Sequence, residues 1–106
     1  MKSRIEKEAV LLAMSDIYMR KILAATMTKE KSVDEISKEM TIPTSTCYRR
    51  VAELLALRLL RVDRTVITGS GKRYEKYRST FSDAKITMIE GELLIDVTVV
   101  PKRQMM

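Results

Sequence analysis

The segment from residue 15 to residue 62 constrains the fold most, because three helical patterns of apolar residues follow one another with only short polar breaks between them. Ser15-Asp16 offers an N-cap to the first of these helices. Ser32 and Glu35 form a capping box for the second, in which each side chain accepts a hydrogen bond from the other residue's backbone amide. Pro43 sets the start of the third. Three helices joined in this way predict a helix-turn-helix.

The third helix divides into an apolar and a polar side when its residues are placed 100° apart. Cys47, Val51 and Leu54 cluster on the apolar side, whereas Ser45 and Arg49 point the opposite way within the first two turns. Small hydroxyls, an aromatic ring and paired arginines at a helix N-terminus suit insertion into a DNA major groove. We therefore expect DNA contacts from Thr44, Ser45, Thr46, Tyr48, Arg49 and Arg50.

These residues are expected to differ in role. Arg49 is the candidate for reading a base edge, whereas Arg50 lies nearer the core edge and suits a phosphate or an acidic neighbour. Thr44 suits an N-cap or a phosphate contact more than a base contact. Tyr48 either contacts DNA or covers the core. Cys47 is expected to be a small buried hydrophobe and not a redox switch.

Positive charge is concentrated in and just after the third helix. The chain of 106 residues has a formal net charge of +6. The stretch from Arg49 to Arg78 holds nine Lys and Arg against three acids, so it carries the whole of this +6, and the remainder of the chain is neutral. Such a sector predicts an anionic partner, and the helix-turn-helix makes double-stranded DNA the expected one.

A first β-hairpin is predicted directly after the third helix. Residues 59–67 are rich in β-branched side chains, Gly69-Ser70-Gly71 signals a turn, and residues 72–79 alternate in polarity. The flanks of the loop are basic, with Arg64 before it and Lys72 and Arg73 after it. We expect this hairpin to act as a wing that lies along the phosphate backbone or probes the minor groove.

A second hairpin is predicted near the C-terminus, around a two-residue turn at Glu90-Gly91. This turn fixes a register that makes one face apolar and pairs Lys85 with Asp96 on the other. Since an isolated hairpin is not stable in water, the apolar face must pack on the domain's own body or on a second subunit, and we favour a homodimer. The residues expected in the dimer contact are Ile86, Met88, Leu93, Ile95 and Val97.

The composition also argues against several classes of protein. No run of 18 apolar residues suits a membrane span, and the charged N-terminal pattern does not resemble a signal peptide, so we expect a cytoplasmic protein. One cysteine and no histidine argue against a disulfide framework, a metal site or a haem cofactor. The same residues leave a nucleophile without a base partner, which predicts that the protein is not an enzyme. Pro101 should end the last strand, with residues 102–106 as a tail.

The arrangement from about Met14 to Ser79 resembles the winged helix-turn-helix transcriptional regulators of the ArsR/MarR type found in archaea and bacteria. The resemblance is carried by four segments: residues 15–23, residues 32–36, residues 42–51, and Glu53-Leu54 with residues 59–62. It implies an α+β winged helix-turn-helix fold, with three to four helices and a hairpin wing over residues 1–79. The C-terminal hairpin, residues 80–106, would then serve dimerisation or packing on the domain body.

The chain departs from this family in three respects. Arg58 stands where a glycine usually ends the third helix, so either the helix runs longer or Arg58 adopts a left-handed conformation. The Cys and His clusters of the metal-sensing members are missing, so metal sensing does not carry over. The C-terminal hairpin also differs from the helix through which many members dimerise.

The resemblance and the residues together predict a sequence-specific regulator of transcription, acting as a repressor at the nucleoid. Two alternatives remain open: a winged-helix module that binds another protein, and an architectural protein that binds DNA without sequence preference. The apolar face of the second hairpin supports the first alternative. The basic sector and the polar outward face of the third helix argue against it.

Overall fold

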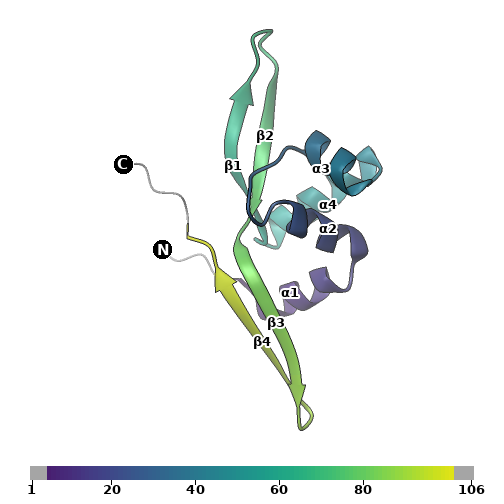
Figure 1. Ribbon diagram of the computed structural model, residues 1–106, viewed down its shortest axis with the longest axis vertical. Helices are drawn as coiled ribbons and strands as arrows, with labels where there is room; N and C mark the ends of the chain where they lie inside the picture. The colour runs from purple at the N-terminus through teal and green to yellow at the C-terminus, as the bar shows by residue number, and fades with distance from the viewer. Residues whose placement is uncertain (1–4, 102–106) are drawn as a thin grey trace.

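The computed structural model describes residues 5–101, which form four α-helices and two antiparallel β-hairpins in an α+β arrangement (Figure 1). The helices gather at the middle of a molecule 58 Å long, and the hairpins extend from them in opposite directions. The tail expected at residues 102–106 lies outside the described residues. In chain order the elements are α1 (Lys7–Met14), α2 (Ile17–Ala25), α3 (Val33–Met40), α4 (Thr44–Ala56), β1 (Leu60–Ile67), β2 (Arg73–Ser79), β3 (Phe81–Ile89) and β4 (Glu92–Val99).

The helix starts follow the caps expected from the sequence, with one correction. The Asp16 carboxylate accepts a hydrogen bond from the Met19 amide over 2.9 Å, and the capping box of Ser32 and Glu35 is formed in both directions. Thr44 is not the N-cap of α4, because Pro43 occupies that position and supplies no side-chain bond. The Thr44 hydroxyl instead lies 3.3 Å from the Ser37 hydroxyl, since α3 packs against this end of α4.

Arg58 ends α4 in a left-handed conformation, with a φ of 63°. Its amide donates to the Leu55 carbonyl oxygen, and the Leu59 amide donates to the Leu54 carbonyl oxygen, each over 3.0 Å. This pair of bonds is a Schellman motif, which satisfies the last carbonyl groups of the helix. Of the two expected outcomes for Arg58, the left-handed one is therefore confirmed.

One hydrophobic core lies between the helices and the bases of both hairpins. Its fully buried side chains include Ile22, Leu23, Ile36, Leu54 and Phe81. Ile95 from β4 belongs to the same cluster, so the C-terminal hairpin shares the core of the helices. No helix among residues 5–101 is long and apolar enough to cross a membrane.

The first hairpin joins β1 and β2, with an irregularity in the register between Val62 and Arg64. A third segment borders it, because Lys31 and Tyr77 exchange both backbone hydrogen bonds, over 2.9 and 2.7 Å. This bridge fixes the loop before α3 against the outer edge of β2. The hairpin is thereby held beside the N-terminal ends of α3 and α4.

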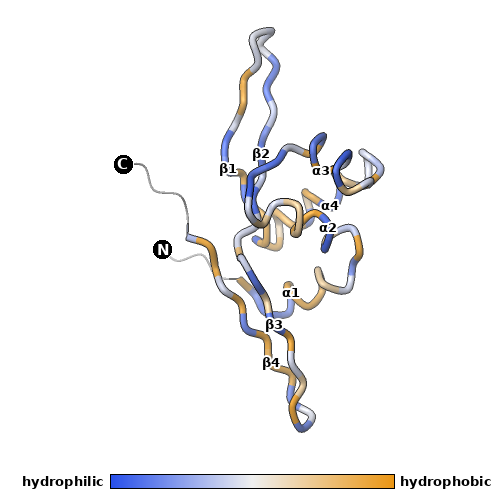
Figure 2. Tube along the Cα trace, viewed as in Figure 1, coloured by the Kyte–Doolittle hydropathy of each residue, from blue (hydrophilic) through white to orange (hydrophobic). Residues whose placement is uncertain are grey.

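The second hairpin has the register expected from the sequence. Met88 pairs with Leu93, Ile86 with Ile95, Ala84 with Val97, Lys85 with Asp96 and Thr87 with Leu94. Glu90 and Gly91 form the turn with φ values of 49° and 83°. Figure 2 shows hydrophobic residues continuing along both strands towards the tip.

The apolar face of this hairpin is covered only at its base. Ile95 is buried against the helices, whereas Met88 near the tip is 69% exposed and Ile86 and Leu93 are also exposed. The base of the hairpin is therefore covered by packing on the domain's own body. The tip of the hairpin is left without a partner in residues 5–101.

A buried polar link joins α2 to the point where β2 passes into β3. Thr26 and Ser79 are both fully buried, and their hydroxyl oxygens lie 2.9 Å apart. The Ser79 hydroxyl donates to the Leu23 carbonyl oxygen over 2.8 Å, and the Ser79 amide donates to the Thr26 carbonyl oxygen over 3.0 Å. These bonds satisfy polar groups that would otherwise destabilise the core.

Candidate nucleic-acid interface

The division of α4 into an inward and an outward side is confirmed. Cys47, Val51 and Leu54 are buried, and burial raises the pKa of the Cys47 thiol. Ser45 and Arg49 are exposed on the other side. The polar side of α4 is thus accessible over its first two turns, which is the geometry that a DNA-reading helix needs.

The two adjacent arginines of α4 are held in different ways. The Arg50 guanidinium lies 3.1 Å from the Asp16 carboxylate and 2.8 Å from the Glu53 carboxylate. The hydrogen bond that Arg50 donates to the Glu53 carboxylate raises the pKa of Arg50, and the charge of Asp16 acts in the same direction. Of the two roles expected for Arg50, the contact with an acidic neighbour is therefore present. Arg49 makes no ion pair within residues 5–101 and projects into solvent.

The first turn of α4 has no side-chain cap. Since Pro43 has no side-chain acceptor, the amides of Thr44, Ser45 and Thr46 depend on solvent or on a ligand. The N-terminus of a 13-residue helix also carries a partial positive charge, and free amides at such an end suit a phosphate oxygen. This end of α4 can therefore offer hydrogen-bond donors to the same anion that Arg49 attracts.

The three cations expected on the first hairpin are not equally available. Arg64 lies 3.2 Å from the Glu30 carboxylate, and Arg73 lies 4.0 Å from that of Glu75. Lys72 forms no ion pair with any of the described residues and is exposed at the tip. Because the side chains of Arg64 and Arg73 are each more than half exposed, a phosphate can compete for either arginine.

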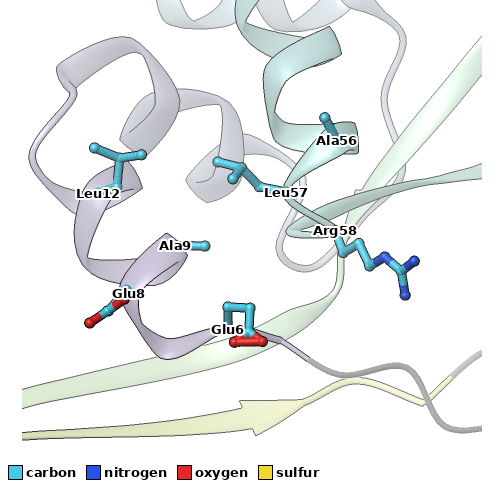
Figure 3. Close-up of a pocket in the computed structure, with 7 residues that line it drawn as sticks. All are labelled: Glu6, Glu8, Ala9, Leu12, Ala56, Leu57 and Arg58. Atoms are coloured by element: carbon cyan, nitrogen blue, oxygen red, sulfur yellow. The ribbon is translucent and has the colours of Figure 1, made fainter.

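The basic stretch from Arg49 to Arg78 does not form one surface. Arg50 turns towards α2, and the Arg61 guanidinium donates to the Val100 carbonyl oxygen over 3.3 Å. Arg58 lies at the rim of a small cavity between α1 and the end of α4, which Glu6 and Glu8 also line (Figure 3). The chain reverses direction after α4, so charges that are close in sequence separate in space.

An open groove of about 700 Å³ lies between the first hairpin and the N-terminal ends of α3 and α4. Three tyrosines line it: Tyr48 from α4, and Tyr74 and Tyr77 from β2. Burial raises the pKa of Tyr77, with smaller contributions from the charges of Glu75 and Tyr48. Of these three, only Tyr48 was expected from the sequence, although the tyrosines interleaved with basic residues in residues 72–77 are a signal for the other two.

Each of the three carboxylates that line this groove has a partner, and that of Asp34 is Lys38, 3.6 Å away. Glu35 accepts a hydrogen bond from the Ser32 amide, which is the largest cause of its lowered pKa, and Lys76 approaches it to 3.3 Å. Glu75 accepts a hydrogen bond from the Thr65 hydroxyl over 2.9 Å. The groove therefore combines aromatic walls with cations at the hairpin end and does not present a bare acidic cluster.

The comparisons with known proteins add no family to this description. No protein-family model matches the chain, and no curated protein matches it.

Proposed function

We propose that this chain is a sequence-specific regulator of transcription that binds double-stranded DNA through a winged helix-turn-helix. The observation that carries the proposal is the contrast between two neighbouring arginines on α4. Arg50 is tied to Asp16 and Glu53, whereas Arg49 is exposed, without an ion pair in residues 5–101, beside Ser45 on the polar side of the helix. An unpaired guanidinium near the start of an exposed helix suits bidentate bonding to a guanine edge.

The dimensions of the elements support this mode of binding. A helix of 13 residues is about 20 Å long, and its diameter allows it to enter the major groove. In the proposed complex α4 enters that groove, and its uncapped first turn lies at a phosphate. The first hairpin acts as the wing, with Lys72, Arg73 and Arg64 at the flanking backbone.

The proposed regulator acts as a homodimer on a palindromic site. The exposed tip of the second hairpin supports this part of the proposal, because the apolar side chains of Ile86, Met88 and Leu93 remain exposed there. In this role the protein represses by occluding a promoter, works at the nucleoid in the cytoplasm, and catalyses no reaction.

DNA binding can be tested by fluorescence anisotropy over a series of salt concentrations. A duplex obtained by selection from a random library is compared with a scrambled duplex of equal length. The proposal expects the selected site to bind at least ~10³-fold more tightly, with affinity that falls steeply as salt increases. Salt-sensitive binding without preference would indicate an architectural protein instead. A complete lack of binding at low salt would overturn the proposal.

Substitution of Arg49 sharpens the test. Arg49→Ala is expected to weaken binding to the selected duplex by about 10- to 100-fold, and to change binding to the scrambled duplex much less. Lys7→Ala is a matched control, because it removes one exposed positive charge at the start of α1, away from α4's first turn. An equal loss on both duplexes for Arg49→Ala would assign Arg49 to phosphate and refute its role in reading a base.

A further inference from the structure

Three of the chain's four tyrosines lie in the groove between the first hairpin and the helices. Tyr48 is 60% exposed and Tyr74 is 40% exposed, although aromatic side chains are usually buried. Among the described residues, no side chain or backbone group makes a hydrogen bond with the hydroxyl of Tyr48, Tyr74 or Tyr77. The tyrosines come from two elements that are far apart in sequence, so strand propensity alone does not explain why they meet.

Cations lie at one end of these aromatic walls. Lys72 and Arg73 line the groove at the hairpin end, and Lys72 forms no ion pair with any of the described residues. The carboxylates of the lining each have a partner elsewhere: Glu35 is held by the Ser32 amide and by Lys76, Glu75 by the Thr65 hydroxyl, and Asp34 lies 3.6 Å from Lys38. A ligand of the groove would therefore meet aromatic faces beside a positive end.

Exposed tyrosine rings beside basic residues are poorly suited to binding the outside of a DNA duplex. A double helix offers phosphates to a basic groove, but the flat faces of its bases are stacked on one another and cannot meet a tyrosine ring. An unpaired strand offers both groups at once, because its bases can turn outward onto aromatic side chains while its phosphates follow the positive charges. The groove thus has the two features that proteins use to hold single strands.

We propose that the groove binds an unpaired segment of DNA, with bases stacked on Tyr48 and Tyr74 and phosphates at Lys72 and Arg73. This inference deepens the proposed function and rests on it, since the unpaired segment belongs to the DNA that α4 binds. The protein then holds a strand opened beside its site. Stacking of a base on an aromatic side chain is lost on substitution by alanine, and each tyrosine is expected to contribute about 5- to 150-fold in affinity.

The chain offers a direct signal for stacking, because it has four tyrosines and no tryptophan. We would titrate the full-length protein with an unlabelled twelve-nucleotide oligothymidine and record tyrosine emission, and measure affinity by anisotropy with the same strand labelled. The expected result is binding with quenching of about half of the emission, since bases stack on two of the four tyrosines. Lys72→Ala should reduce the salt dependence by about 0.7 in the logarithmic slope, the value for one phosphate of a single strand.

Substitutions in the groove test the stacking itself. Tyr48→Ala and Tyr74→Ala are each expected to weaken binding of the strand about tenfold, whereas Tyr74→Phe should rescue it because a phenyl ring also stacks. Tyr18→Phe is the matched control, since Tyr18 is the one tyrosine that does not line the groove. Circular dichroism of each variant shows whether its fold is retained.

The outcomes separate this inference from the proposed function. Binding to the selected duplex, without binding or quenching by the single strand, would overturn the groove proposal and leave the regulator proposal standing. Quenching by the strand without binding to any duplex would overturn the regulator proposal and leave the groove proposal standing. Unchanged strand binding in both alanine variants would also overturn the groove proposal. So would equal quenching by thymidine monophosphate at the same base concentration, which would assign the groove to a free nucleotide.

Discussion

Ser79→Ala tests the buried polar link that joins the hairpins to α2. The substitution removes a hydroxyl that donates to the Leu23 carbonyl oxygen over 2.8 Å and lies 2.9 Å from the Thr26 hydroxyl, at a site with no exposed surface. Alanine fills nearly the same space as serine. The variant therefore loses hydrogen bonds while the packing of the core is preserved.

The expected loss follows from the number of bonds. Each neutral hydrogen bond contributes about 1 kcal/mol to the free energy of unfolding. The Thr26 hydroxyl keeps an acceptor in the Ile22 carbonyl oxygen, 2.9 Å away, so it is not left unsatisfied in the variant. We therefore expect Ser79→Ala to destabilise the protein by about 1–2 kcal/mol. For a domain of this size that corresponds to a melting temperature lower by roughly 4–16 °C.

Urea denaturation followed by far-ultraviolet circular dichroism measures this loss. Ser70→Ala serves as the matched control, because its hydroxyl is exposed in the loop of the first hairpin and, among the described residues, is hydrogen-bonded only to the Thr68 hydroxyl, over 3.0 Å. The control should lie within about 0.5 kcal/mol of the parent protein. A cycle with Thr26→Val should show a coupling of at least about 0.5 kcal/mol. A loss for Ser79→Ala no larger than that of the control would refute the reasoning.

Three further predictions concern single residues. Glu90→Asn should stabilise the protein by about 0.5 kcal/mol, because φ is 49° at this turn position and Asn tolerates a positive φ better than Glu does. An unchanged melting temperature would contradict this expectation. The hydrogen bond from the Ser32 amide is the largest cause of the lowered pKa of Glu35, whose usual value is 4.5. The stabilisation by ionised Glu35 is therefore complete above pH 4.5 and is lost as the pH falls below that value. Glu35→Gln should therefore flatten the acid limb of a plot of melting temperature against pH, and an equally steep limb would count against that bond. Since Cys47 is buried with a raised pKa, a colourimetric thiol reagent should react with it only at the rate of unfolding, and rapid labelling of the native protein would show otherwise.

The features that could be predicted from the sequence are those decided by neighbouring residues. The register of the second hairpin from the turn at Glu90-Gly91 back to the pair of Asp83 and Thr98 followed from that two-residue turn, and it shifts only beyond this pair, between Phe81 and Asp83. The capping box of Ser32 and Glu35 spans four residues and needs no distant partner. The buried stripe of α4 follows from helical spacing alone. Each of these predictions rests on local geometry that the rest of the chain does not alter.

The features that could not be predicted depend on contacts between distant segments. Arg50 forms an ion pair with Asp16 at the N-cap of α2, and nothing in the sequence around either residue indicates that pair. Thr44 loses its expected capping role because α3 brings Ser37 to its hydroxyl. The tyrosine groove exists because Lys31 bridges β2 at Tyr77, which sets the hairpin beside Tyr48. A sequence pattern cannot show which distant segments meet in this way.

The strands β2 and β3 are separated by Thr80 alone, so one backbone runs from Arg73 to Ile89 along most of the molecule (Figure 1). Its midpoint is clamped, because the Thr80 hydroxyl donates to the Arg58 carbonyl oxygen over 2.9 Å and buried Ser79 and Phe81 flank it. A backbone clamped at its middle cannot pivot there. Force on the tip of either hairpin is therefore carried into the helical core at this junction.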